Sequence, residues 1–374
     1  MLRATYFDHN ATAPVTAEVA DAIAGAIALP GNASSVHTAG RQARQLVEQA
    51  REHIALLIGA SPAQIVFTSG GTEANNLVLR GTECDHILAS AVEHDSVLVA
   101  ADNIEQMPVD GDGVINLAAL AAKLAEMDGQ ALVSVMLANN ETGVIQPVAE
   151  ISRLAKERGA LVHTDAIQAL GKVKVDWTEL AVDFMSLSAH KIGGPQGAGV
   201  LVVNEAVPLQ SLIKGGGQER SRRAGTENVP GIVGFGAAAN LAAENIDKAN
   251  EIKILRDHLE SKIKSMAPDA VVFGERVDRL PNTICLSMPN VSSETQVMKF
   301  DLTGIMVSAG SACSSGRVQA SHVLKAMGVG EEVASTAIRV SLGDSNTKEE
   351  VDYFVSQWRE IYVRANSENF KGAA

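Results

Sequence analysis

The sequence lacks several features that would place it in common classes of protein. Its 374 residues include only three cysteines, Cys84, Cys285 and Cys313, which are too few and too scattered for a disulfide framework or a four-ligand zinc site. There is no G-x-G-x-x-G motif, no P-loop lysine motif and no G-x-S-x-G motif after a strand. Nucleotide-binding folds and nucleophile-elbow hydrolases are therefore poorly supported.

Positive charge and long apolar runs are also scarce. The chain carries 31 Lys and Arg against 44 Asp and Glu, a net charge of -13, which argues against nucleic acid or an anionic membrane as a partner. No apolar run is long enough to cross a bilayer, and the first residues contain no apolar signal segment. We therefore expect a cytoplasmic protein. With 46% hydrophobic residues, the chain can bury a large core and form more than one domain.

The most informative stretch is an apolar segment that leads to Lys191. A buried strand is predicted by the apolar, β-compatible residues Val182, Phe184, Met185 and Leu187, and the glycines and proline at 193–195 end it. Lys191 is then expected at the carboxyl end of a strand, where α/β sheets place their chemistry. Burial there can remove its charge, as a lysine needs before it attacks an aldehyde. Taken alone, a solvated loop lysine is the simpler interpretation.

A second segment of the same form ends in Asp165. It precedes Lys191 by 191 − 165 = 26 residues, which suits two neighbouring strands whose ends share one pocket. A carboxylate that pairs with a pyridine nitrogen keeps the ring protonated, and the protonated ring is the electron sink of pyridoxal phosphate chemistry. An aspartate after a strand is by itself more often a helix N-cap. The combination of Asp165 with Lys191 is what favours the cofactor.

Alternating helix and strand patterns predict a largely parallel sheet covered by helices on both faces. Strands are expected at 65–68, 86–90, 132–137, 199–203, 271–273, 283–288 and 337–342, and helices at 16–28, 40–58, 148–158 and 294–302. One long helix is expected from Ala237 to about Met266. In the last strand, alternation puts Ile338 and Val340 on one face and Arg339 on the other.

Two further polar groups are expected at strand ends. The strand at 65–68 leads through glycines into a helix, where the backbone amides at Gly71 and the Thr72 hydroxyl can bind a phosphate. An ordinary helix start is the alternative. His94 follows the strand at 86–90, where an imidazole can stack on a planar ring or transfer protons, or can serve a structural role.

The three cysteines are expected to differ in exposure. Cys285 lies in an alternating strand and Cys84 at the start of another, so both are expected to be buried and unreactive. Cys313 is surrounded by Ser, Ala and Gly, which predict an accessible loop that bends easily. A thiol with a pKa of about 8.5 is only a few per cent ionised at neutral pH. Either His94 or a substrate group could take its proton, and the sequence does not choose between them.

Several motifs together resemble those of the NifS/IscS-type cysteine desulfurases, over a range from Asp8 to Gly343. They are Ser188-Ala-His-Lys191, His163-Thr-Asp165-Ala-Ile-Gln168, Asn139-Asn140-Glu-Thr-Gly143 and Ser308-Ala-Gly-Ser-Ala-Cys313-Ser-Ser-Gly316. The resemblance implies the α/β fold of PLP-dependent transferases, fold type I, with a mainly parallel seven-stranded sheet between helices and a smaller α/β C-terminal domain. It predicts a large PLP-binding domain at 12–248. The small domain would comprise 1–11 and 249–374 and carry the catalytic cysteine loop.

The resemblance also assigns roles to individual residues. Lys191 would bind pyridoxal 5′-phosphate (PLP), and Cys313 would take sulfur from L-cysteine as a persulfide, releasing L-alanine. His94 would stack on the cofactor and act as acid and base, while Arg339 and Asn140 would bind the substrate. The other expected cofactor contacts are Gly71, Thr72, Asn140, Asp165, Gln168, Ser188, His190 and, from the second subunit of a homodimer, Thr226. Cys313 is also a candidate transient ligand of an iron–sulfur cluster.

Other functions remain open at this point. A related fold-type-I enzyme, such as an aminotransferase or a selenocysteine lyase, would share the lysine, aspartate and arginine, and a cofactor-binding scaffold without turnover would share the cofactor. The sulfur acceptor could be an iron–sulfur scaffold protein or a protein of another thio-cofactor pathway. Gln196 and Asp344-Ser345 depart from the usual family residues, which leaves the identity of that acceptor undecided.

Overall fold

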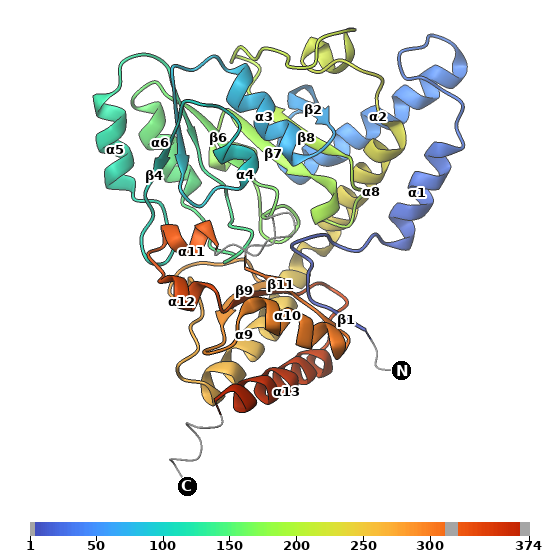
Figure 1. The fold of residues 1–374 in the computed structure, drawn as a ribbon. Helices are drawn as coiled ribbons and strands as arrows, with labels where there is room; N and C mark the ends of the chain where they lie inside the picture. Colours follow the sequence, from blue (N-terminus) through green and yellow to red (C-terminus); the bar gives the residue numbers. More distant parts are fainter. Residues whose placement is uncertain (1–3, 311–320, 367–374) are drawn as a thin grey trace.

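The computed structural model describes residues 4–310 and 321–366 and divides them between a large and a small lobe (Figure 1). The large lobe is built on a seven-stranded sheet with the order β2-β8-β7-β6-β5-β3-β4. Its strands are β2 (Ile65–Thr68), β3 (His86–Ser90), β4 (Ile104–Met107), β5 (Ala131–Ser134), β6 (Leu161–Asp165), β7 (Phe184–Ser188) and β8 (Gly199–Val203). β8 pairs antiparallel with both β2 and β7, and all the other strand pairs in this sheet are parallel. The α/β architecture and the mainly parallel sheet expected from the sequence are confirmed.

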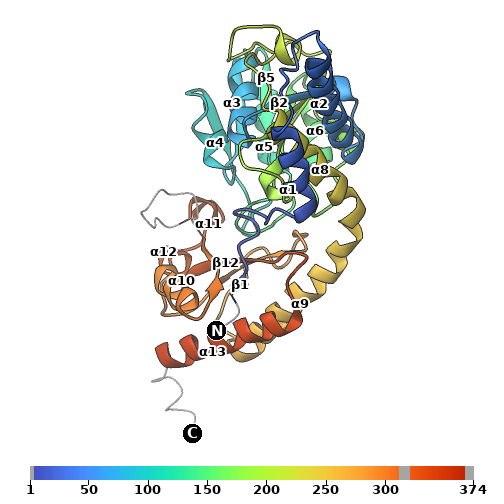
Figure 2. The ribbon, with the colours of Figure 1, turned by 90° about the vertical axis from the view of Figure 1, so that its right-hand side faces the viewer.

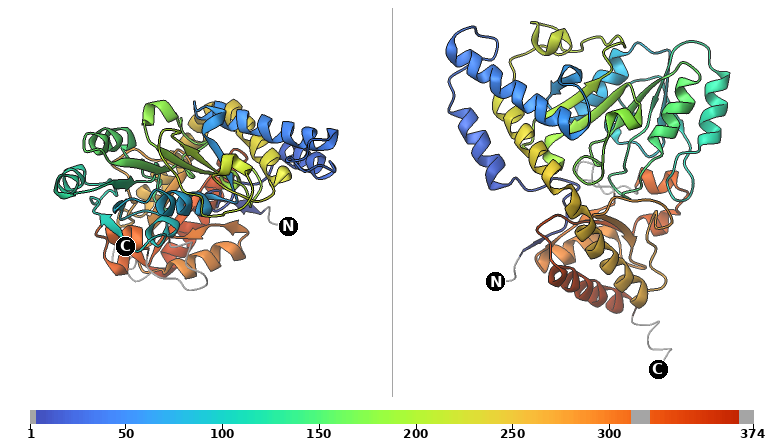
Figure 3. Two further views of the ribbon diagram at one scale, coloured as in Figure 1. Left: turned by 90° about the horizontal axis from the view of Figure 1, so that it is seen from above. Right: turned by 180° about the vertical axis from the view of Figure 1, so that it is seen from behind.

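Helices cover both faces of this sheet, as the view from above shows (Figure 3). On β8, Val200 and Val202 face one apolar cluster while Leu201 and Val203 face the other. This alternation explains why the strand is apolar throughout. The first cluster includes α2 (Thr38–Leu57), α5 (Leu117–Glu126), α6 (Val148–Lys156) and α8 (Val229–Asn245), and the second includes α3 (Gly71–Gly81) and α4 (Asp95–Leu98). Helix α1 (Ala17–Ile27) packs against α8, and α7 (Trp177–Leu180) precedes β7.

The small lobe has its own apolar core. Its strands are β1 (Thr5–Tyr6), β9 (Thr283–Ser287), β10 (Ile305–Met306), β11 (Ser308–Ala309) and β12 (Ala337–Ser341), in the sheets β1-β10 and β11-β12-β9. Its helices are α9 (Ala249–Met266), α10 (Ser293–Leu302), α11 (His322–Ala326), α12 (Glu331–Ala334) and α13 (Lys348–Ala365). Figure 2 shows α9 descending from the large lobe and α13 lying across its lower end.

Two expected elements differ in the structure. The long helix is interrupted, because the 3-10 turn η4 (Ile246–Lys248) separates α8 from α9, and Asn245 before it leaves helical geometry at φ -102 and ψ 3. Asparagine competes with helical hydrogen bonds, which weakens a helix at this point. The strand expected at 271–273 is a single bridge between Val272 and Leu286, since the chain turns at Gly274 with φ +69. The remaining 3-10 turns are η1 (Pro62–Gln64), η2 (Ala189–Lys191) and η3 (Gln218–Ser221).

The segment before α1 joins the two lobes. β1 pairs with β10 in the small lobe, and the Phe7 ring is fully buried in the core of that lobe. Asp8 then forms a bridge with Ser341, and the Ala13 amide donates a hydrogen bond to the His190 carbonyl at 2.8 Å. The segment thus passes directly by the carboxyl end of β7. No helix in the described part of the chain has the length and apolar character needed to span a membrane.

Candidate active site

The parallel pair β6 and β7 brings Asp165 and Lys191 to the same edge of the sheet. Asp165 is the last residue of β6 and pairs in register with Ser186 of β7. Lys191 follows in the turn η2. Both side chains line one cavity of about 300 Å³, within the range of about 300 to 1,000 Å³ that is usual for small-molecule sites. The neighbouring-strand arrangement inferred from their spacing is therefore confirmed.

This cavity collects most of the residues predicted from the sequence. Its lining includes Gly71, Thr72, His94, Asn140, Asp165, Gln168, Ser188, His190, Lys191 and Arg339. Thr226 is exposed and does not line it. Cys313 lies outside the described residues. Cys285 is buried, as expected, and burial raises the pKa of its thiol. Cys84 is only half-buried and precedes β3.

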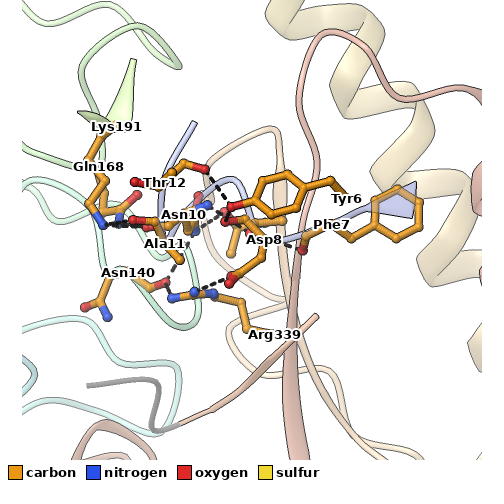
Figure 4. Close-up of polar contacts among 12 residues, drawn as sticks. Tyr6, Phe7, Asp8, Asn10, Ala11, Thr12, Asn140, Gln168, Lys191 and Arg339 are labelled. Atoms are coloured by element: carbon orange, nitrogen blue, oxygen red, sulfur yellow. Dashed lines mark hydrogen bonds and ion pairs between the residues drawn. The ribbon is translucent and has the colours of Figure 1, made fainter. Parts of the chain in front are cut away.

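Lys191 is held by the segment that joins the lobes. Its Nζ donates hydrogen bonds to the backbone carbonyls of Asn10 at 2.6 Å and Ala11 at 2.9 Å. Figure 4 shows the lysine approaching this segment from one side while Arg339 approaches from the other. Gln168 Nε2 donates to the same Asn10 carbonyl at 2.9 Å. The amine is thus fixed at the cavity wall.

Asp165 is positioned by two hydrogen bonds on its two carboxylate oxygens. The Asn75 amide donates to Oδ2 at 2.8 Å, and the backbone amide of Ile167 donates to Oδ1 at 3.0 Å. Burial raises the pKa of Asp165, while these two bonds oppose the increase. Asn75 also donates to Ser96 Oγ at 2.9 Å, and that hydroxyl lies 2.8 Å from His94 Nδ1. One polar chain therefore orients both Asp165 and His94.

Arg339 reaches the cavity from the small lobe. Alternation along β12 turns Ile338 and Val340 into the small-lobe core and Arg339 toward the cavity, as predicted. The arginine is 2% exposed; its Nη1 donates to the Asn140 carbonyl at 2.9 Å and its Nη2 contacts Asp8 Oδ1 at 2.8 Å. A buried guanidinium is in place to bind a carboxylate at the cavity, next to Asn140.

The first turn of α3 also lines the cavity, through Gly71 and Thr72. A Cβ at Gly71 would lie 2.1 Å from Ile167 Cδ1, so a larger residue at the start of the helix would require the Ile167 side chain to move. His190 Nδ1 lies 2.7 Å from Thr12 Oγ1. Burial, followed by the charges of Lys191 and Lys172, lowers the pKa of His190 to about 4, so its imidazole is neutral at pH 7. The start of α3 and the neutral His190 ring line the same cavity, and a helix N-terminus of this kind is suited to binding a phosphate.

Sequence reasoning missed three residues beside the cavity. Asn10 is fully buried and contacts Lys191, Lys172 donates to Gln168 Oε1 at 2.6 Å, and Glu141 is a buried carboxylate next to Asn140. Asn10 lies near the start of the range over which the family resemblance runs, and Glu141 lies inside the Asn139–Gly143 motif. Lys172 is four residues beyond Gln168, a spacing that could have pointed to it. Among the described residues, no cluster of His, Cys, Asp and Glu could hold a metal ion.

Glu141 makes folding stability depend on pH. Burial raises the pKa of its carboxyl from 4.5 to about 7, although the hydrogen bond from Ser321 Oγ at 2.5 Å opposes this. The folded state therefore retains a proton that the unfolded chain releases. This contribution to stability is complete below pH 4.5 and is lost as the pH rises through 7. A shift of this size corresponds to a fall of up to about 3 kcal/mol in the free energy of unfolding.

We expect Glu141→Gln to flatten this pH dependence. Glutamine can still accept the Ser321 hydrogen bond but has no proton to lose, so the variant should exceed the wild type in stability at pH 8 and not at pH 5. Urea unfolding at the two pH values measures the difference. Glu150→Gln, at an exposed position of α6, is the control and should follow the wild type. Parallel pH curves for Glu141→Gln and the wild type would contradict the prediction.

Comparison with known proteins shows which proteins this chain is similar to. The family Aminotransferase class-V matches residues 5–354. The chain is similar to a cysteine desulfurase of Sinorhizobium fredii, with 45% identity over 94% of each chain. It is also similar to the cysteine desulfurase IscS of Dictyoglomus turgidum, with 42% identity over 94% of this chain and 93% of the relative. The solved structure of a NifS-like protein from Rickettsia africae superimposes with a TM-score of 0.90 at 38% identity, covering 96% of this chain and 99% of the other.

Proposed function

We propose that the cavity at Lys191 is where L-cysteine loses its sulfur, because the chain belongs to the aminotransferase class-V family and is a PLP-dependent cysteine desulfurase. It has the fold-type-I architecture of the NifS-like structures. The observation that carries the proposal is the convergence of Lys191, Asp165 and Arg339 on one cavity. They supply an amine for an aldehyde, a carboxylate for a ring nitrogen and a guanidinium for a substrate carboxylate.

The residues that line the cavity fit PLP. Lys191 would bind its aldehyde and the buried Asp165 its ring nitrogen, while His94 would lie against the ring. Gln168 and Asn140 would contact the ring oxygen, and Gly71, Thr72, Ser188 and His190 would hold the phosphate. When bound, the protonated cofactor supplies the electron sink that weakens the carbon–sulfur bond of the substrate. The hydrogen bonds that Asp165 accepts and those that Lys191 donates hold both groups in place at the cavity.

The substrate would be oriented by Arg339 and Asn140. Arg339 contacts Asp8 through Nη2 in this structure, and its Nε has no hydrogen-bond partner among the described residues. A substrate carboxylate would therefore add to or replace the Asp8 contact on a guanidinium that is already fixed. A bidentate fork of this kind selects an amino acid by its α-carboxylate, and a lysine could not reproduce it.

Sulfur transfer is assigned to Cys313, on the basis of the sequence motif around it. The thiolate would attack the substrate sulfur and form a sulfur–sulfur bond with its own electron pair. The carbon–sulfur electron pair would stay on the substrate carbon, which takes a proton and leaves as L-alanine. The enzyme then carries a persulfide on Cys313. A role for Cys313 as a transient iron–sulfur ligand belongs to the same proposal.

The assembly and partners are further parts of the proposal. By the family resemblance, Thr226, which is exposed and does not line the cavity of its own chain, would reach the cavity of the other subunit in a homodimer. A sulfur acceptor or iron–sulfur scaffold protein would receive the persulfide sulfur in the cytoplasm. The separate apolar core of the small lobe supports a domain boundary near residue 248, with 1–11 and 249–374 forming the small domain.

The test is the stoichiometry of turnover. The PLP-loaded protein should release L-alanine and, with a thiol reductant, sulfide from L-cysteine in equal amounts. A transaminase would instead require a 2-oxo acid as amino acceptor, and a selenocysteine lyase would release selenide from L-selenocysteine while leaving L-cysteine intact. Alanine without an equivalent amount of reducible sulfur would overturn the proposal.

A further inference from the structure

Glu141 lies where two separate parts of the small lobe meet the large lobe. Ser321, the residue before α11, donates a hydrogen bond from its hydroxyl to Glu141 Oε2 at 2.5 Å. A Cβ at Gly310, which follows β11, would lie 3.8 Å from the same oxygen. Glu141 and Ser321 are 4% and 2% exposed. In the sequence, residues 311–320, which include Cys313, come between Gly310 and Ser321.

The start of α11 is attached to the large lobe by a second hydrogen bond. His322 Nε2 donates to the backbone carbonyl of Glu93 at 2.9 Å. Figure 1 shows α11 at the junction of the two lobes. Glu93 directly precedes His94, and Glu141 directly follows Asn140. Both hydrogen bonds from the start of α11 therefore reach the immediate neighbour of a residue that lines the cavity.

The turn that carries Glu141 is fixed by the side chain of Asn139. Its Oδ1 accepts hydrogen bonds from the backbone amides of Glu141 and Thr142, both at 2.9 Å. In the same turn, the carbonyl of Asn140 accepts a hydrogen bond from Arg339 Nη1 at 2.9 Å. The Glu141 carboxyl therefore has a set position relative to the two residues that would bind the substrate.

We propose that Glu141 is a positioning residue for sulfur transfer: its carboxyl holds Ser321 and packs against Gly310, and so fixes the two flanks of the Cys313 segment beside the substrate site. The inference rests on the proposed function, because it concerns how the thiol meets the substrate. Fixing both ends of a chain segment restricts the positions that the residues between them can reach, and a reactant held near its partner reacts faster. Glu141 does not line the cavity, so it should affect sulfur transfer and not cofactor capture.

The test separates substrate binding from sulfur transfer in a single turnover at pH 7. The PLP-loaded protein is mixed with L-cysteine, and the change in cofactor absorbance measures binding. Mass spectrometry of quenched samples measures the persulfide on Cys313. In Glu141→Ala and in Ser321→Ala, we expect persulfide formation to slow about tenfold, which corresponds to about 1.4 kcal/mol, a usual contribution of one hydrogen bond. The lysine adduct and the binding of L-cysteine should match the wild type.

A double-variant cycle distinguishes this contact from a general loss of packing. If the hydrogen bond between Glu141 and Ser321 carries the effect, the doubly substituted protein should be about as slow as either single variant. Independent effects would instead multiply to about a hundredfold loss. Glu141→Gln keeps an oxygen that can accept the Ser321 hydrogen bond, so this variant should form the persulfide at nearly the wild-type rate.

Two variants at exposed positions are the matched controls. Glu150→Ala removes a carboxylate from α6, and Ser335→Ala removes a hydroxyl from the small lobe. Both should form the persulfide at the wild-type rate. Circular dichroism checks folding, and Ser321→Ala, which removes a single oxygen atom, gives the same readout if Glu141→Ala does not fold.

The outcomes distinguish this inference from the proposed function. A wild-type rate of persulfide formation in Ser321→Ala and Glu141→Ala would overturn the inference. An equal slowing of L-cysteine binding, or multiplied losses in the double variant, would also overturn it, because either result indicates a packing role only. Failure of the wild-type protein to form a persulfide on Cys313 would overturn the proposed function itself.

Discussion

Lys191→Ala is expected to abolish the lysine adduct of PLP and to lower the rate of alanine formation from L-cysteine by at least about four orders of magnitude. In the wild type, attachment to Lys191 would hold the cofactor beside the substrate, and such a positioned reactant has an effective concentration of about 10⁵ M or more. The variant would have to bind the cofactor through Asp165 and the expected phosphate contacts alone. The absorbance of the purified protein and the initial rate of alanine release measure the two effects.

Two control variants distinguish the need for a reactive amine at position 191 from the need for a positive charge there. Lys191→Arg retains a cation in the same position but cannot attack an aldehyde at neutral pH, so it should be as inactive as the alanine variant. The exposed Lys174→Ala should keep both the adduct and the rate. A Lys191→Ala protein that still shows a borohydride-reducible adduct and releases alanine at more than a hundredth of the wild-type rate would contradict the assignment.

Cys313→Ser is expected to keep the lysine adduct and lose persulfide formation completely. A serine hydroxyl remains protonated at neutral pH and cannot accept sulfur from the substrate, whereas a thiolate can. Incubation with L-cysteine, followed by mass spectrometry of the peptide containing residue 313, measures the added sulfur atom. The unchanged adduct absorbance shows that the cofactor site is intact.

The other two cysteines provide the matched controls for this substitution. Cys84→Ser changes a half-buried thiol outside the cavity, and Cys285 is fully buried with its thiol pKa raised by burial. Cys84→Ser should therefore form the persulfide on Cys313 at the wild-type rate. Persulfide on another cysteine in Cys313→Ser, with undiminished sulfide release, would contradict the role of Cys313.

The sequence was sufficient to predict the strand ends that build the cavity. Asp165 and Lys191 each follow a short apolar strand, and parallel strands joined by one crossover place their ends at the same edge. Arg339 followed from alternation, because Ile338 and Val340 could only face an apolar core. In each case, local periodicity already determined the direction of the side chain.

The buried polar network could not be predicted in this way. Asn10 contacts Ser341, which is 331 residues away, and Glu141 contacts Ser321 at a separation of 180 residues. No local pattern distinguishes such a residue from an ordinary loop residue, because its burial depends on how two lobes meet. The break in the long helix at η4 has a different origin. Asn245 is visible in the sequence, but whether it interrupts the helix depends on the position that α9 takes in the folded protein.

The segment from β1 to Asn10 has a consequence for biosynthesis. Its partners in the small lobe include Ile305, Arg339 and Ser341, so a ribosome makes one side of these contacts near the beginning of translation and the other near the end. Contacts between such distant residues form late because the intervening chain must first be ordered. The large lobe can therefore fold during synthesis while the cavity at Lys191 stays incomplete. We expect nascent chains that stop before residue 341 to bind the coenzyme poorly, and complete chains to acquire it after release.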